Sequence, residues 1–482
     1  MDSTPGNGPH RADPGPDGQI PLSAATCAPA RTEAGTAPSE AAAGRRRILR
    51  LALPAMGEMV LHMAVWMIDT AMVGRLGAAA LSSVGLGGQV YFSALFAVGA
   101  VGVGCTALVA RHVGEGRLDR AGFYGGQSIT LSLALGVLLT SAAWLAAPGV
   151  FRLAGLGREV SASGVVYLRI LSLAAPFHLS NLAAGAILRG SGDARTPLFV
   201  AGLTNLINAL ADYLLIFGVG GFPRLGVRGA ALASAAGVAA GSLAYVAVYL
   251  SGRPRVRPGR SSLFPLRPRE AWRVLRLSIP AGLESLLMDG ARTVNTFIIT
   301  VLGTVPFAAA QVAIAAESLS FMPGYGFTLA ASVLAGQNLG AGQHRRAVGE
   351  TWQSLRMAVA VMGGMGLVFL LFPRPLTSLF TTDAGVVREA ARCLFVAAFA
   401  QPFLAITEVL CGALRGAGDT RTPLGITVLG AWGLRVPLVF LAVRVAGLSL
   451  VYAWVVMVVE WAVRAVVSAA LFRRGRWLRT RV

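Results

Sequence analysis

The chain of 482 residues has few charged side chains and no lysine. Asp, Glu, Lys and Arg together make up 13% of the sequence, whereas a soluble domain of average composition carries about 25%. All 42 basic residues are arginines, and against 22 acidic residues they give a net charge of +20. This composition excludes an ordinary soluble domain. No basic face interleaved with exposed aromatic residues accompanies the positive charge, so we expect no nucleic-acid partner.

Cysteine is also scarce. Cys27, Cys105, Cys393 and Cys411 follow no spacing typical of a metal site or a redox motif. The last three lie in apolar segments, where we expect buried free thiols. The chain lacks the HExxH and GxSxG motifs and any Asp or His cluster at catalytic spacing, so we expect neither an enzyme nor a cofactor.

Apolar residues, in contrast, make up 55% of the chain, and the mean hydropathy is +0.65. Apolar runs recur that exceed the ~18 residues typical of a membrane span. The sequence therefore predicts an all-α polytopic membrane protein with twelve transmembrane helices. We expect these helices at about 47–73, 80–110, 122–147, 160–188, 197–219, 226–250, 271–302, 306–336, 347–372, 386–413, 423–444 and 447–471.

An internal repeat organises these helices. The stretch ILRGSGDARTPL at 187–198 returns as ALRGAGDTRTPL at 413–424, a spacing of 226 residues. The same spacing links Pro54 with Pro280 and Glu58 with Glu284. The chain is thus one unit of six helices used twice. Because six is even, the two copies cross the membrane in the same direction, as parallel repeats that can enclose a central cavity. This architecture favours a transporter.

The predicted domains follow from the repeat and from the arginines. They are a disordered tail (1–43), a first lobe (44–251), a solvated linker (252–270), a second lobe (271–472) and a basic tail (473–482). Arginines concentrate in the segment entering the first helix, the linker, the loops on that side and the C-terminal tail. By the positive-inside rule this side is cytoplasmic. We therefore expect an inner (plasma) membrane protein with both termini in the cytoplasm.

The two GD loops are expected to be turns between helices. Gly190 and Gly192 permit a tight turn, Thr196 suits a helix N-cap and Pro197 suits the first helical position. A phosphate-binding loop would need a preceding strand and a Lys-Ser/Thr ending, which are missing. The loop is either a structural hairpin or a contact that takes part in gating.

Acidic residues inside the first lobe are the strongest functional signal. A charged group at membrane depth costs about 2.5–3.5 kcal/mol, so its presence indicates a function or a partner. Asp69 lies near the outer end of the first helix, and Asn205, Asn208 and Asp212 form one polar stripe on the fifth. Two carboxylates in a poorly hydrated pocket bind protons readily, and with asparagine carbonyls they can hold Na⁺. The alternative is that Asp69 faces an aqueous vestibule and Asp212 pairs with an arginine.

The repeat provides an internal comparison for this site. At a spacing of 226, Asp69 corresponds to Asn295, Asp212 to Leu438 and Asn208 to Leu434. The second lobe thus keeps the fold without these carboxylates. We therefore place the coupling-ion site in the first lobe.

Five other acids have less certain roles. Glu58 and Glu284 follow a proline by one turn in both lobes; they are either gate or substrate residues or structural partners at the kink. Asp289 is expected to pair with Arg292 one turn later. Glu317 and Glu408 are candidates for contact with a cationic substrate.

At these residues the chain resembles the multidrug and toxic compound extrusion (MATE) transporters, and it is most similar to their DinF-like branch. The resemblance covers about 45–472. It rests on IDTAMVGRLG at 68–77, the paired RGxGDxRTP loops, Asn208-x3-Asp212 and GVRGAALAS at 226–234. It implies two six-helix bundles in a V and export of small organic cations, drugs among them, by antiport with H⁺ or Na⁺.

The resemblance further implies a proton or sodium site at residues matching Asp69, Asn208 and Asp212, joined by Ser234, with Asn181 lining the same cavity. Many family members carry a second-lobe acid eight residues after the seventh-helix proline, but here Met288 occupies that position. We expect a monomer in the lipid bilayer that works by alternating access. The alternative is a flippase or exporter of a lipid-linked precursor from a related branch.

Overall fold

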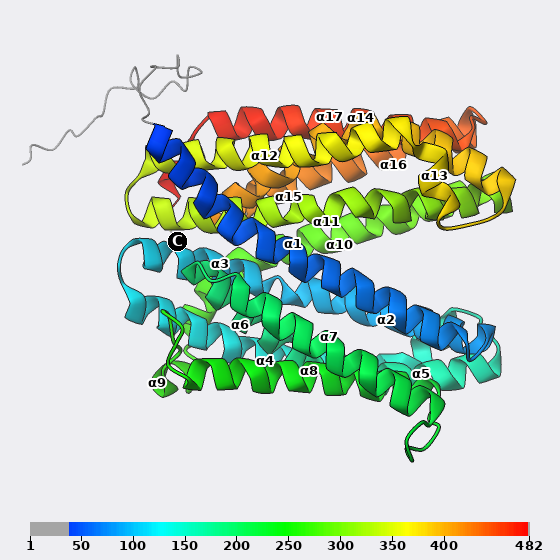
Figure 1. Ribbon diagram of the computed structural model, residues 1–482, viewed down its shortest axis with the longest axis horizontal. Helices are drawn as coiled ribbons and strands as arrows, with labels where there is room; N and C mark the ends of the chain where they lie inside the picture. Colours follow the sequence, from blue (N-terminus) through cyan, green and yellow to red (C-terminus); the bar gives the residue numbers. More distant parts are fainter. Residues whose placement is uncertain (1–37, 481–482) are drawn as a thin grey trace, which may run out of the picture.

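The computed structural model describes residues 38–480, and every regular element in that range is a helix. The elements form two bundles that lie side by side (Figure 1). The first bundle holds α1 (Pro38–Gly74), α2 (Ala78–Gly99), α3 (Val101–Gly114), α4 (Leu118–Leu153), α5 (Arg158–Ser172), α6 (Ala175–Ser191), α7 (Arg195–Phe217) and α8 (Val227–Leu250). The second bundle holds α10 (Pro268–Ile299), α11 (Thr304–Gly340), α12 (His344–Leu371), α13 (Pro373–Ser378), α14 (Ala384–Gly416), α15 (Arg421–Thr427), α16 (Val436–Phe440) and α17 (Leu450–Arg473).

The bundles match the predicted repeats. Among the described residues, ten helices are long and apolar enough to cross a membrane. The pair α5 and α6, bent by 46°, makes an eleventh span. Helix α10 is less apolar and completes the twelve as the counterpart of α1. The predicted all-α membrane fold of two six-helix repeats is confirmed.

Three predicted helices differ in detail. Helix α1 begins at Pro38, so the last residues of the predicted tail are helical, and residues 1–37 lie outside the described part of the chain. The second predicted helix is interrupted at Ala100. The fourth is broken between α5 and α6, just before Pro176. Proline lacks an N–H and disfavours helical geometry in the residue before it, which accounts for that break.

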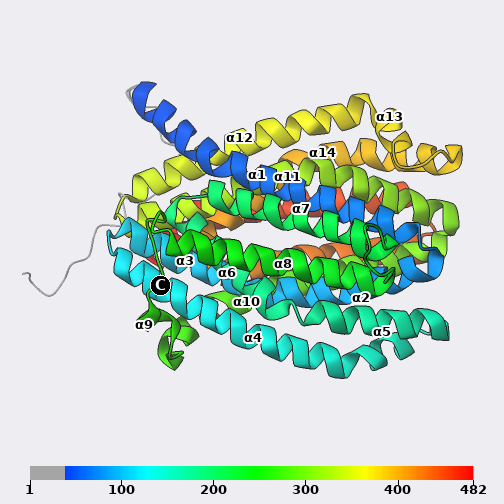
Figure 2. The same ribbon diagram turned by 60° about the horizontal axis from the view of Figure 1, so that its bottom comes forward.

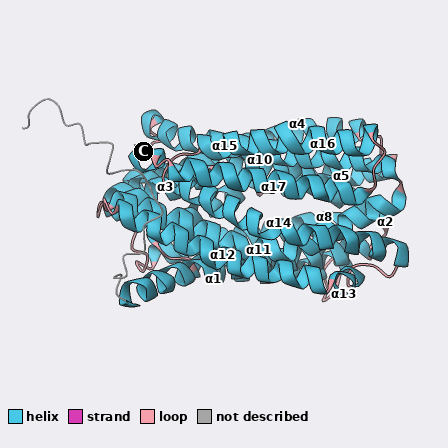
Figure 3. Ribbon diagram, turned by 90° about the horizontal axis from the view of Figure 1, so that it is seen from above, coloured by secondary structure: helices cyan, strands magenta, loops and turns pink. Residues whose placement is uncertain are grey.

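Helices α1 and α10 connect the bundles. Helix α1 packs against α7 of its own bundle and against α11 of the other, and α10 packs in turn against α2 and α3. Figure 1 shows α1 crossing from one bundle to the other, and Figures 2 and 3 show the bundles from two further sides. The start of α1, the linker and the C-terminus all lie at one end of the molecule, called here the linker end.

The linker is not merely solvated, as its composition predicts. It contains the short helix α9 (Arg260–Leu263), and its backbone lies on α4. The Gln127 amide nitrogen donates to the carbonyl oxygen of Ser262 (2.8 Å), and its oxygen accepts from the Arg267 N–H (2.7 Å). A Cβ at Gly122 would overlap the linker backbone at Arg257. Small residues on α4 thus seat the linker, which a composition argument misses.

Candidate ion and substrate sites

Asp69 on α1 and Asp212 on α7 meet inside the first bundle. Their carboxyl groups lie within hydrogen-bonding reach of each other, and the Asn208 side chain lies within reach of Asp212. Asp212 is 1% exposed, Asn208 5% and Asn205 7%, while Asp69 is half-buried. The predicted pairing of the two aspartates in one pocket is therefore observed. The alternative of an Asp212–arginine pair is not, because no ion pair among the described residues involves Asp212.

The polar atoms of this pocket lack partners. Both Asp212 carboxylate oxygens, Asp69 Oδ1, Asn208 Oδ1 and Asn205 Nδ2 are buried without a hydrogen-bond partner within residues 38–480. Buried polar groups are nearly always hydrogen-bonded, so a cluster of unpaired ones indicates a ligand or a proton. Carboxylate and amide oxygens suit hard cations, and a carboxyl pair also suits a shared proton. The described residues contain no group of three or more His, Cys, Asp or Glu that could hold a metal ion.

The two residues added by resemblance behave differently from this pair. Asn181 donates to the carbonyl oxygen of Val238 (3.0 Å) and accepts from the Ser242 hydroxyl (2.8 Å), so its amide joins α6 to α8. Its hydrogen bonds lie within the first bundle, which corrects its predicted role in the cavity. Ser234 on α8 is half-buried, and its place in the ion site stays a prediction. Tyr167 on α5 lies within electrostatic range of both aspartates and carries no sequence motif that would reveal it.

The structure corrects the register of the internal comparison. The segment Val428–Arg435 between α15 and α16 is a π-helix, which adds one residue to the span. Buried residues before it match α7 at a spacing of 226, and those after it match at 227. The buried pairs are Pro197 with Pro423, Ala201 with Thr427, Asn205 with Ala431, Asn208 with Arg435, Asp212 with Val439 and Ile216 with Val443. The counterpart of Asn208 is therefore Arg435, not Leu434.

Arg435 belongs to a buried ion-pair network in the second bundle. Its guanidinium lies 2.6 Å from Glu460, which also pairs with Arg464 at 3.3 Å. Arg464 donates to the Thr427 hydroxyl (3.0 Å), which donates to Glu284 (3.2 Å). Glu460 is fully buried and Arg464 is 2% exposed. Where the first bundle has unpaired oxygens, the second thus has a fixed cation already paired with an acid.

The paired glutamates of the repeat have arginine partners in their own lobes. Glu58 receives two hydrogen bonds from Arg189, at 3.1 and 3.2 Å. Glu284 receives two from Arg415, at 2.7 and 3.2 Å. In both lobes the arginine lies 131 residues after the glutamate. The open choice for Glu58 and Glu284 is thereby narrowed: they are structural partners of arginines rather than of backbone groups freed at the kink.

The other second-lobe acids divide into paired and unpaired ones. Asp289 pairs with Arg292 at 3.7 Å, as predicted. Glu317 on α11 and Glu408 on α14 are half-buried. Neither has a hydrogen bond or an ion pair within the described residues, although Arg435 acts on Glu317 through its charge, and Arg415 and Arg464 act on Glu408. They are the acids left available to a cationic ligand.

The bundles make close contact at the linker end. A Cβ at Gly114 on α3 would overlap the backbone of Gln337 on α11, and one at Gly340 would overlap Arg111. Gln337 also donates to the carbonyl oxygen of Gly190, beside the first GD loop (2.8 Å). That loop is therefore both a turn and a contact between lobes. Its helix is capped by Asp193, which accepts from Thr196 N (3.1 Å), and not by Thr196 as predicted.

Two further contacts across the bundles at this end are related by the repeat. Arg47 on α1 pairs with Glu350 on α12 at 2.9 Å. At 226 residues from each partner, Arg273 on α10 donates to the Tyr124 hydroxyl on α4 at 2.7 Å. Glu270 accepts from the same hydroxyl at 2.8 Å. One contact is thus ionic and the other runs through a tyrosine, and together they hold the linker end closed.

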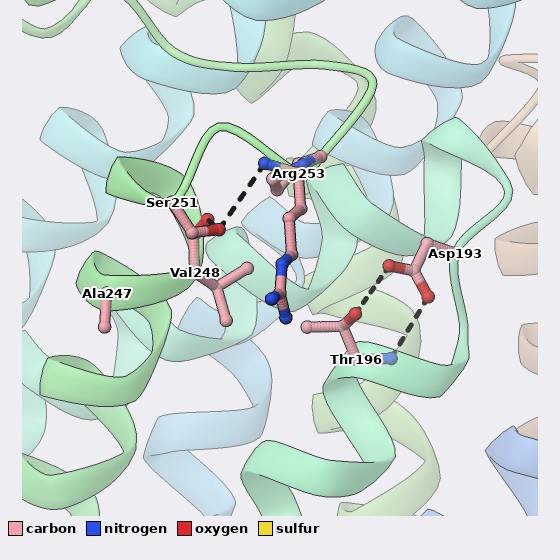
Figure 4. Close-up of a pocket in the computed structure, with 7 residues that line it drawn as sticks. Asp193, Thr196, Ala247, Val248, Ser251 and Arg253 are labelled. Carbon is pink, nitrogen blue, oxygen red and sulfur yellow. Dashed lines mark hydrogen bonds between the residues drawn. The ribbon is translucent and has the colours of Figure 1, made fainter.

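A pocket of about 330 Å³ also lies at the linker end, between the start of α7 and the end of α8 (Figure 4). The Arg253 side chain points into it beside Thr196. Its acid, Asp193, already accepts two hydrogen bonds from Thr196. The pocket therefore adds no acceptor to the sites above. The thiols of Cys105, Cys393 and Cys411 are buried and free, as predicted.

Comparisons with known proteins agree with this geometry. The MatE family model matches twice, over residues 54–214 and 280–441. The "Probable multidrug resistance protein NorM" of Thermotoga maritima is 34% identical over 90% of this chain and 93% of its own length. That of Pseudomonas aeruginosa is 30% identical over 85% of both chains. A solved MATE transporter described as outward-facing superposes with a TM-score of 0.84 at 23% identity, over 91% of this chain and 97% of that one, which supports the fold.

Proposed function

Because the chain belongs to the MATE family and is a multi-pass membrane transporter rather than an enzyme, we propose that it exports small organic cations by antiport with H⁺ or Na⁺. The observation that carries this proposal is the pair Asp69 and Asp212, whose oxygens lack partners inside the first bundle. The similarity to proteins named for multidrug resistance supports a drug-like substrate. The assignment to the DinF-like branch stays a prediction.

In the proposed cycle the coupling ion binds between the two aspartates. A proton bound by either carboxyl lets it donate to the other, and Na⁺ would take the same oxygens together with Asn208 Oδ1. Either ion relieves repulsion between two carboxylates that share a dry pocket. Binding therefore favours closer packing of α1 against α7. Because α1 also packs against α11, a shift of α1 reaches the second bundle.

The proposed substrate contacts are the acids that the protein leaves unpaired. Glu317 and Glu408 have no ion-pair partner within residues 38–480, whereas Glu58 and Glu284 are held by arginines. A cation can replace the missing partner at moderate cost, because a carboxylate at membrane depth gains from any opposite charge. We place the linker end in the cytoplasm, so the closed contacts there correspond to a state open outward, in a monomer in the inner membrane.

The test is efflux of a cationic dye from proteoliposomes, with pH and Na⁺ varied independently. We expect Asp69→Asn and Asp212→Asn to abolish gradient-driven efflux, because an amide neither carries a proton nor supplies a carboxylate charge. A matched control is Asp289→Asn, which removes a carboxylate already paired on its own helix. Efflux that persists in both aspartate variants would contradict the proposal.

The same assay separates the alternatives. Loss of efflux on Na⁺ removal, without a pH effect, assigns the coupling ion as Na⁺. Glu317→Gln is expected to raise the KM for a dication more than for a monocation. Transport of a lipid-linked precursor in place of the dye would favour the flippase, but the buried arginines that such a substrate needs are paired with glutamates here.

A further inference from the structure

The linker and the start of α10 carry an unusual density of exposed arginine. Residues 253–276 contain eight arginines and one acid, Glu270, and all eight arginines are exposed. Several are already occupied. Arg273 pairs with Glu270, Arg267 lies over the Phe123 ring, Arg257 donates to a backbone carbonyl and Arg253 points into the pocket beside Thr196. Arg255, Arg260, Arg269 and Arg276 have neither a hydrogen bond nor an ion pair within residues 38–480.

Helix α10 shows how these arginines lie relative to a bilayer. Its exposed face carries Ile279, Leu283 and Leu286, then Trp272, with Arg276 and Arg269 toward the linker end. This order, from apolar side chains through tryptophan to arginine, is what a helix shows where it passes from hydrocarbon to headgroups. Trp272 is 59% exposed, and Phe264 of the linker is 65% exposed. The free arginines therefore lie at headgroup level.

The linker is held in place, so its charges form a fixed surface. Gln127 binds the linker through three hydrogen bonds, and Thr130 donates to the carbonyl oxygen of Leu263. Val256 is 1% exposed and Ser262 5%. A flexible basic tail would attract anions without selecting a geometry, whereas a seated one presents guanidinium groups in fixed positions that suit bidentate contact with phosphate.

We propose that the seated linker and the first turns of α10 form a binding surface for anionic phospholipid, with Arg255, Arg260, Arg269 and Arg276 on the phosphodiester headgroups and Trp272 and Phe264 in the interface. The proposal is independent of the transport mechanism, since it uses none of its residues. A basic residue near an anionic membrane surface contributes about fivefold to the partition constant, so four of them give a preference of several hundredfold at most.

The test is native mass spectrometry of the full-length delipidated protein, titrated with phosphatidylglycerol or phosphatidylcholine. We expect the wild type to bind the first phosphatidylglycerol at least tenfold more tightly than phosphatidylcholine. Replacing the four free arginines with glutamine should remove that preference. The matched control replaces four exposed arginines at the opposite end, Arg158, Arg374, Arg388 and Arg444, and should keep it.

Two further arms define the source and the geometry. Inorganic phosphate at the same concentration should not displace the lipid; displacement at equal concentration would show a phosphate site and overturn the proposal. Gln127→Met, which keeps every arginine but releases the linker, should weaken the preference. An unchanged preference in the four-arginine variant, or equal loss in the control, would also overturn it.

Discussion

At the scale of residues, the two lobes differ most where side chains are most deeply buried. Asn208 faces Asp212 in the first lobe, whereas its counterpart Arg435 faces Glu460 in the second. A guanidinium held by a carboxylate is a permanent substitute for a bound cation. The second lobe therefore needs no external ion to neutralise its buried acid, and the first lobe does.

This difference was only half predictable from the sequence. Asp69 and Asp212 stand out because acids are rare in apolar helices, and that signal located the pocket correctly. Arg435, Glu460 and Arg464 come from two helices whose facing sides no single-sequence pattern reveals. The π-helix that shifts the register by one residue leaves no compositional mark, so the spacing of 226 matched Asn208 to the wrong residue.

The first prediction concerns the second-lobe network. Glu460→Gln leaves two buried arginines facing an amide, and removing one partner of a buried ion pair costs about 3–5 kcal/mol. We expect a corresponding loss in the free energy of unfolding, measured by denaturant titration in micelles. Asp289→Asn breaks a partly exposed pair, which is worth about 0–1 kcal/mol. Equal losses in both variants would contradict the network's role.

At the scale of elements, prolines have different effects in different spans. Pro54 and Pro280 lie inside continuous helices, whereas α5 ends shortly before Pro176. The sequence marks each proline but not which helix packs beside it. At Pro176 the neighbour is Gly136 of α4, which comes so close that a Cβ there would overlap the proline backbone. The bend and the glycine therefore form one packing unit.

The second prediction tests that unit. Gly136→Ala adds a methyl group where the contact is backbone to backbone, and overpacking of this kind costs about 1–3 kcal/mol. Gly149→Ala on the same helix meets nothing within 4 Å and should stabilise α4 by about 0.5 kcal/mol, since alanine favours helices. Thermal unfolding of the two variants should shift in opposite directions. A shift in the same direction would show that the bend does not depend on Gly136.

At the scale of the whole molecule, the repeat makes the closure of the linker end nearly symmetric. Arg47 with Glu350 and Arg273 with Tyr124 occupy equivalent positions in the two halves. Their spacing was present in the sequence, but Tyr124 and Glu350 gave no signal because each sits on a helix next to common residues. Only the ionic contact depends on a charge in both partners, so the two should respond differently to mutation.

The third prediction follows from that asymmetry. Arg47→Glu places a carboxylate against Glu350 and removes a charge-assisted hydrogen bond worth about 1.5–3 kcal/mol, so the linker end should open roughly ten- to a hundredfold more often. A cysteine introduced at Ala110, buried against Gly336, should then react faster with a thiol reagent. Combining Arg47→Glu with Glu350→Arg should restore protection. Equal reactivity in all three proteins would argue against a gating role.

The central claim is that Asp69 and Asp212 carry the coupling ion, and ion flux driven by substrate tests it most directly. In proteoliposomes with no initial ion gradient, an imposed gradient of a cationic dye should drive H⁺ or Na⁺ in the opposite direction through the wild type. Asp212→Asn should bind the dye and move no ion. Substrate-driven ion flux at the wild-type rate in Asp212→Asn would contradict the account.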